Sequence, residues 1–279
     1  MNIFSSRIGA LREMMRSKGW DAVIITGSDP HGSEYPADRW KQVEWLCGFT
    51  GEAGDVVVTA DHAGLWTDSR YFIQATCQLE GSGVELHKTR IPGEIPIPQW
   101  LAGQFGEEGI VAVDGYCVSA AFADSLPGTV VSVPDILGRF WTDRPPVPQT
   151  PVFTVQTGET RQSKIERLRG FLKEKQCEGI LLSSLDEIAW TLNVRASDIE
   201  YNPLVISYLL VTCDRVLWYV LKGDIEDPQT QATLSILEND GVEALPYTDI
   251  DYVGDELQGR LFIDSASLNY DIFSALRAR

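Results

Sequence analysis

The chain has 279 residues, of which 44% are hydrophobic, and it contains eight tryptophans. This length favours two domains, and the composition is sufficient for a packed core, which argues against disorder. The formal net charge of −17 would repel a phosphate backbone. Nucleic acid is therefore not an expected partner.

The cysteines and the apolar segments indicate the cellular compartment of the protein. The five cysteines are widely spaced, and none forms a C-x-x-C pair typical of zinc ribbons or redox motifs. No apolar run resembles a signal peptide, and the most apolar segment, residues 204–213, is too short to cross a bilayer. We expect a cytoplasmic protein with no membrane partner.

The predicted elements begin with an amphipathic helix. Ile8, Leu11 and Met15 recur at helical spacing, and residues 21–25 then form an apolar strand. A similar helix starts near Ser163, where Ser163 and Glu166 form a candidate capping box. The second strand follows at residues 178–182. This order suggests that the second half repeats the first.

Further strings match in the same order along both halves. They are 45–49 with 190–194, 56–61 with 209–214, 64–67 with 216–219, and 111–114 with 261–264. Such an ordered series predicts a duplicated domain. In the first copy, a tight turn at residues 60–63 predicts an antiparallel hairpin. Helices that alternate with these strands indicate an α/β fold, each copy being a mixed sheet flanked by helices.

The domain boundaries follow from a proline-rich segment, residues 141–151. We predict a first domain over residues 1–145, a stiff linker over 146–160 and a second domain over 161–279. The second copy has no equivalent of the apolar string 130–133, so we expect it to be truncated at its C-terminal end.

A search for catalytic chemistry finds no nucleophile, base and orienting group together. Gly48, Gly51 and Gly54 have the wrong spacing for a dinucleotide loop, and we interpret them as a turn with positive φ. We interpret His62 as a solvated turn residue and His87 as structural. His31 lies in a polar loop of the first half, at residues 28–44, which is either a lid or pocket wall, or a loop with its side chains in water.

One polar turn is harder to explain by structure alone. Asp68 is placed to cap a helix that follows a strand, but Arg70 would then oppose the helix dipole. A guanidinium at this position suggests an anionic or carbonyl partner. An ordinary ion pair with Glu34 or Asp38 is the alternative.

Several strings resemble cytosolic-type Xaa-Pro aminopeptidases, also called aminopeptidase P. They are the loop at 27–35, the glycine-rich 48–54, the W-T-D-x-R-Y string at 65–72, the inter-domain stretch 141–145, and 185–195 with 198–203. Together they are specific, although Ser69 stands where the family would have glycine. The resemblance runs from about residue 7 to the last residue.

This resemblance implies a three-domain enzyme that removes the N-terminal residue from peptides with proline second. The chain would supply its two tandem creatinase-like domains, of ribonuclease H-like architecture, and the pita-bread catalytic domain would be absent. Two divalent ions, manganese or zinc, would sit in that missing domain. We therefore assign no catalytic residue and no metal ligand to this chain, and we expect it to be inactive alone.

The resemblance also implies partners and substrate contacts. Arg70 matches the family arginine that faces the substrate cleft, and His31 is a weaker candidate for binding proline-containing peptides. The partners would be the catalytic domain and, in a homodimer, a second subunit. Two other interpretations remain: a stand-alone tandem creatinase-like binding or scaffold module, and a magnesium-dependent nucleotide hydrolase, for which we find no converging carboxylates.

Overall fold

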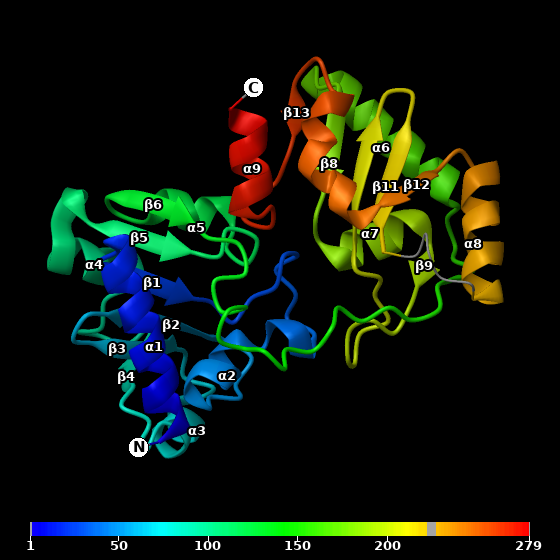
Figure 1. Cartoon of the computed structure of the whole chain (residues 1–279). Helices are drawn as coiled ribbons and strands as arrows, with labels where there is room; N and C mark the ends of the chain where they lie inside the picture. The colour runs from blue at the N-terminus through cyan, green and yellow to red at the C-terminus, as the bar shows by residue number, and fades with distance from the viewer. Residues whose placement is uncertain (1, 222–226, 279) are drawn as a thin grey trace. The chain divides into compact units, whose positions relative to one another are not determined.

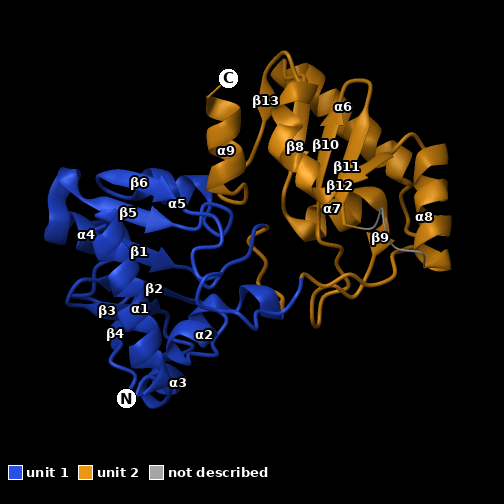
Figure 2. Ribbon diagram, viewed as in Figure 1, with its two compact units in different colours: residues 1–30, 38–146 blue, residues 31–37, 147–279 orange. Residues whose placement is uncertain are grey.

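The computed structural model describes residues 2–221 and 227–278 of the chain. These residues form two compact units (Figure 2). Unit 1 comprises residues 1–30 and 38–146, and unit 2 comprises residues 31–37 and 147–279. A short segment from the first part of the sequence is therefore counted with unit 2.

Unit 1 alternates strands and helices along the chain. Its elements are α1 (Ile3–Lys18), β1 (Ala22–Ile25), η1 (Asp38–Trp40), α2 (Gln42–Cys47), β2 (Gly54–Thr59), β3 (Ala63–Thr67), α3 (Phe72–Gln78), β4 (Glu85–Lys88), α4 (Ile97–Phe105), η2 (Gly106–Glu108), β5 (Ile110–Val113), α5 (Ala120–Ser125) and β6 (Thr129–Ser132). Ile8, Leu11 and Met15 of α1 are buried, as their spacing predicts.

The six strands of unit 1 form one mixed sheet in the order β4-β3-β2-β1-β5-β6 (Figure 1). The pairs β1–β2 and β2–β3 are antiparallel, whereas β3–β4, β1–β5 and β5–β6 are parallel. Helices α1 and α2 pack on β2. The buried core lies between these helices and the sheet.

Unit 2 repeats this alternation. Its elements are β7 (Phe153–Thr154), α6 (Arg161–Lys175), β8 (Gly179–Leu182), α7 (Leu185–Leu192), β9 (Val194–Arg195), β10 (Ser207–Thr212), β11 (Val216–Val220), α8 (Pro228–Asn239), β12 (Glu243–Pro246), η3 (Tyr247–Glu256), β13 (Leu261–Phe262) and α9 (Tyr270–Arg277). Thr160 caps α6 by accepting a hydrogen bond from the Ser163 backbone N–H.

The main sheet of unit 2 has the order β12-β11-β10-β8-β13. With β8, β10, β11, β12 and β13 in the places of β1 to β5, the strand order and every pairing direction match unit 1. Helices α6 and α7 pack on β10, as α1 and α2 pack on β2. The predicted duplication and the mixed α/β fold are therefore confirmed, and within residues 147–221 and 227–278 no strand takes the place of β6.

The hairpin turns fix how the two copies align. In unit 1 the Thr59 hydroxyl donates to Asp61, and in unit 2 the Thr212 hydroxyl donates to Asp214. The strand registers then place Gly64 opposite Val57 and Leu217 opposite Leu210, which makes Gly64 and Leu217 equivalent. The sequence match of Gly64 with Val216 was therefore wrong by one residue, a shift that would reverse the face of every side chain in the strand.

The predicted linker does not form a free spacer along its whole length. Thr150 donates hydrogen bonds from its backbone and its hydroxyl to Asp198, and Val152 is buried in the core of unit 2. Thr230 and Thr233 of α8 bond to the two backbone groups of Val152. From Thr150 onward, this segment is a built-in part of unit 2.

Candidate functional site

The turn that contains Arg70 follows β3 and precedes α3. Asp68 Oδ1 accepts hydrogen bonds from the backbone N–H and from Nε of Arg70, both at 3.0 Å, and Asp68 Oδ2 accepts one from Nη2 at 2.8 Å. These bonds from Arg70 lower the pKa of the Asp68 carboxyl. The Arg70 side chain is 61% exposed. The turn thus presents an oriented guanidinium to solvent.

This geometry corrects two expectations from the sequence. Helix α3 begins at Phe72, and its N-cap, Tyr71, makes no side-chain cap. Asp68 therefore orders the turn before the helix and does not cap the helix itself. Arg70 forms an ion pair with Asp68, which was not among the partners considered, and Asp38 forms one with Lys41.

The aromatic pair of Tyr71 and Phe49 packs beside the turn. The Arg70 guanidinium lies 5.2 Å from the centre of the Tyr71 ring, which meets the Phe49 ring edge-on. A Cβ on Gly51 would come within 2.3 Å of Phe49 and 2.8 Å of Tyr71. The glycine-rich string and the W-T-D-x-R-Y string therefore form one packed feature. Of the three glycines interpreted as a turn, only Gly48 has positive φ, and Gly51 serves this packing instead.

His31 is buried within unit 2, with 2% of its surface exposed. Its Nδ1 lies 2.9 Å from the Ser183 carbonyl oxygen, and its Nε2 lies 2.8 Å from the Tyr247 hydroxyl. Since a carbonyl only accepts, Nδ1 carries a proton and donates it. The ring also packs on Tyr208, with centroids 4.4 Å apart. The interpretation of a water-exposed side chain is wrong for His31, and a contact with peptide stays a prediction.

His62 and His87 lie together, which the sequence did not indicate. Their Nε2 atoms are 3.2 Å apart, and the His87 ring stacks on Trp66 at 3.8 Å. Their side chains are 23% and 13% exposed. His62 is thus a packed residue, and its interpretation as a merely solvated turn residue is wrong.

Comparison with known proteins identifies the two units. The family described as Creatinase/Prolidase N-terminal domain matches residues 7–139, and a second family of the same description matches residues 143–279. The chain belongs to the creatinase/prolidase N-terminal domain family. It carries two such domains in tandem, as the sequence resemblance implied.

The relatives that carry this creatinase-like pair are Xaa-Pro aminopeptidases. The chain is 33% identical to Aminopeptidase P1 of Arabidopsis thaliana and 34% identical to Xaa-Pro aminopeptidase 2 of Homo sapiens, over 88% and 96% of its length. It spans 39% and 42% of those proteins. The X-prolyl aminopeptidase from Caenorhabditis elegans, a cytosolic enzyme with a di-nuclear active site, matches 99% of the chain with a TM-score of 0.90 at 28% identity. The match covers 49% of that structure.

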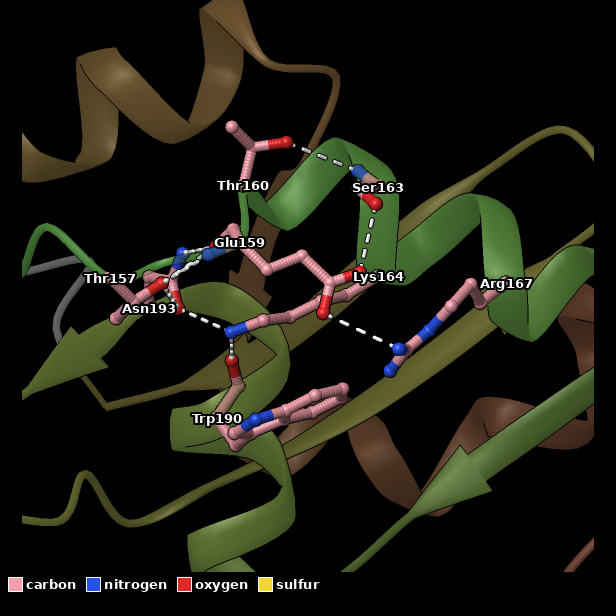
Figure 3. Close-up of polar contacts among 8 residues, drawn as sticks. All are labelled: Thr157, Glu159, Thr160, Ser163, Lys164, Arg167, Trp190 and Asn193. Atoms are coloured by element: carbon pink, nitrogen blue, oxygen red, sulfur yellow. Dashed lines mark hydrogen bonds and ion pairs between the residues drawn. The ribbon is translucent and has the colours of Figure 1, made fainter.

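Both creatinase-like domains share one cationic contact between helices, which sequence reasoning missed. In unit 2, Lys164 of α6 donates to the Trp190 carbonyl at 2.7 Å and to Asn193 Oδ1 at 2.6 Å, and its ammonium lies 4.3 Å from the centre of the Trp190 ring (Figure 3). In unit 1, Arg7 of α1 donates to the Trp45 carbonyl and lies 4.1 Å from that ring. A cation from the first helix thus binds the end of the second in each domain. The match of Trp45 with Trp190 in the sequence was the signal that could have indicated this contact.

Burial lowers the pKa of both cations. Each cation meets the C-terminal end of a helix, where the backbone carbonyls carry partial negative charge. Asn193 and Gly48 terminate these helices in the left-handed conformation. The shared contact therefore closes a helix end and is structural, which leaves Arg70 as the candidate for substrate.

Proposed function

We propose that this chain is the non-catalytic N-terminal region of an Xaa-Pro aminopeptidase, an enzyme that removes the N-terminal residue from peptides with proline second. The observation that supports this most directly is the match of both domains, as a pair, to the C. elegans enzyme. In this proposal the catalytic domain holds two divalent ions, manganese or zinc, and works in the cytoplasm. The chain contributes a wall of the substrate cleft and a surface for subunit association.

The role of Arg70 in this proposal rests on how the turn is built. Asp68 and Tyr71 orient the guanidinium, while most of its side chain remains exposed. A guanidinium held in this way binds a carbonyl or carboxylate of a peptide with charge-assisted hydrogen bonds.

Among the helices that the structure describes, none is long and apolar enough to cross a membrane.

The first test uses the chain alone. Incubated with Mn²⁺ and an Xaa-Pro peptide, the purified chain should release no N-terminal residue, because we assign it no catalytic group. The peptide bond cleavage is followed by mass spectrometry. Stoichiometric release before proline would contradict the proposal.

The second test uses the enzyme with its catalytic domain. Arg70→Ala should lower kcat/KM for Xaa-Pro peptides by about one to two decades, since a hydrogen bond to a charged group contributes about 1.5–3 kcal/mol. Metal content should not change.

Arg167 offers a matched control. It is also 61% exposed, pairs with Glu159 at 3.4 Å and lies 5.3 Å from the centre of the Trp190 ring. Arg167→Ala should leave kcat/KM unchanged. Equal effects of the two substitutions, or normal kinetics of Arg70→Ala, would show that Arg70 does not contact substrate and would favour a scaffold function for the chain.

A further inference from the structure

A second cluster of metal-binding side chains lies on unit 1 and contains no residue of the Arg70 turn. His62 immediately precedes β3, and Glu85 and His87 belong to β4, the edge strand of the sheet. One ligand atom from each of these three residues lies within 4.8 Å of the other two. Two imidazoles and a carboxylate are a common donor set for zinc.

The strand register explains why these side chains meet. Gly64 pairs with Glu85, and Trp66 pairs with His87. Because side chains alternate along a strand, Glu85 and His87 point to one face, and His62 and Trp66 to the same face. The opposite face carries Leu65 and contributes to the core. The cluster is thus fixed by strand geometry and lies outside the main core.

Gly64 provides the space in which the two rings meet. A Cβ at this position would lie 2.6 Å from His62 Nε2 and 2.7 Å from His87 Cδ2. Any larger residue would push the imidazoles apart. The absence of a side chain at the centre of the cluster is therefore a condition for their 3.2 Å approach.

The duplicated domain shows how this position looks without such a cluster. Arg215 is equivalent to His62, and it pairs with Glu243, the equivalent of Glu85, at 3.1 Å. Leu217 stands in place of Gly64, and Leu245 in place of His87. An ion pair is therefore sufficient to hold this edge of the fold. The two imidazoles and the glycine of unit 1 are specific to the first copy.

We propose that His62, His87 and Glu85 bind one divalent ion of the zinc type, which ties the edge strand β4 to the start of β3. Two ligands of a tetrahedral zinc ion at about 2.0–2.1 Å are separated by about 3.3–3.4 Å. The two Nε2 atoms are already near that separation, at 3.2 Å. Glu85 is 69% exposed, and its Oε2 lies 3.8 Å from His62 Nδ1, so its side chain has to turn towards the two Nε2 atoms to bind the ion. This assignment departs from the sequence analysis, which gave the chain no metal ligand.

The surroundings suit an imidazole that binds a cation. Glu94 Oε2 lies 3.6 Å from His87 Nδ1, on the side of the ring away from His62. A carboxylate behind a metal-bound histidine orients the ring and makes it a better ligand.

The test is a calorimetric titration of the chelator-treated 279-residue chain with Zn²⁺, with the thiols kept reduced. We expect one Zn²⁺ per chain and a rise in Tm on binding. His62→Arg, which copies the second domain, should abolish both effects and keep an ion pair with Glu85. Glu94→Gln should weaken binding by about 10- to 100-fold. Cys77→Ser, which removes an exposed thiol of the same unit, should change nothing.

Two results would overturn the proposal. One is the absence of binding at millimolar Zn²⁺, which would make the imidazole pair a simple hydrogen bond. The other is an unchanged stoichiometry in His62→Arg, which would place the ion elsewhere. Circular dichroism checks the fold, and if His62→Arg is unfolded, Glu85→Gln at the exposed ligand carries the same test. Because the proposed peptidase function assigns no catalytic group to this chain, neither result bears on that function.

Discussion

At the scale of single residues, Asp55 shows how the fold changes the chemistry of a side chain. It lies on β2, and its Oδ1 accepts a hydrogen bond from the Gly27 backbone N–H at 3.1 Å. Burial raises the pKa of the carboxyl to about 6, against the opposing effect of that hydrogen bond. The folded chain therefore holds this proton at a pH where the unfolded chain has lost it.

The sign of the pH dependence follows from this proton. Between about pH 4 and pH 6 the folded state binds more protons than the unfolded state, so the contribution of Asp55 to the free energy of unfolding falls as pH rises, by about 1–3 kcal/mol. Asp55→Asn should remove this part of the pH dependence of the free energy of unfolding. It should also stabilise the chain at pH 7, since the amide oxygen still accepts a hydrogen bond from the Gly27 backbone N–H. Urea unfolding across this pH range measures the difference.

The exposed Asp124 provides the control for this measurement. Asp124→Asn should leave the pH dependence of the free energy of unfolding as it is in the unsubstituted chain. If Asp55→Asn lowered stability at pH 7, the ionised carboxylate would be the stabilising form, and the direction argued above would be reversed.

At the scale of elements, the end of α7 depends on a charge from another helix. Lys164 is almost fully buried, and its ammonium satisfies the Trp190 carbonyl and Asn193 Oδ1. Methionine would fill the same space but could not donate. Lys164→Met should therefore destabilise the chain by about 1–3 kcal/mol, because the Trp190 carbonyl loses this donor and Asn193 Oδ1 keeps only its bond from the Thr157 hydroxyl. Chemical denaturation measures this loss.

Lys173 lies exposed on the same helix and serves as the matched control. Lys173→Met should change the free energy of unfolding by less than about 0.5 kcal/mol. A loss of similar size in both variants would show that the helix responds to its total charge and not to the bonds of Lys164.

The elements also show what the sequence could predict. The order of helices and strands and the duplication could be predicted, because apolar periodicity and turn residues are local signals. The alignment of β3 with β11 could not, since Val216 and Leu217 of β11 are both apolar and either could follow the turn. The meeting of His62 with His87 depends on the register of β3 against β4 and on Gly64, so three separate residues had to be placed in space first.

The candidate site residues also divide into those with a local signal in the sequence and those whose partners are distant in the sequence. Arg70 was singled out because an arginine in the first turn of a helix is unfavourable, but α3 begins only at Phe72, so that local argument does not hold and its contact with substrate stays a prediction. The true partner, Asp68, lies two residues away but was assigned to a helix cap. The partners of His31 lie at Ser183 and Tyr247, more than 150 residues further along the chain, and no local pattern predicts them.

At the scale of the whole molecule, the order of the sequence and the division into units differ at one segment. Residues 31–37 are counted with unit 2, although unit 1 contains the residues on either side. His31 anchors this segment among Ser183, Tyr208 and Tyr247. A change at residue 31 should therefore act on the second domain.

His31→Phe tests this directly, because it keeps an aromatic ring against Tyr208 but removes both hydrogen bonds. It should destabilise unit 2 by about 1–3 kcal/mol, since the Ser183 carbonyl and the Tyr247 hydroxyl each lose a partner. Amide hydrogen exchange followed by mass spectrometry should show faster exchange in β8 and β10 and unchanged exchange in β1 and β2. Tyr247→Phe, which removes one of the two bonds, should give a smaller effect in the same strands. Faster exchange confined to β1 and β2 would instead show that the segment stabilises the domain in which its sequence lies.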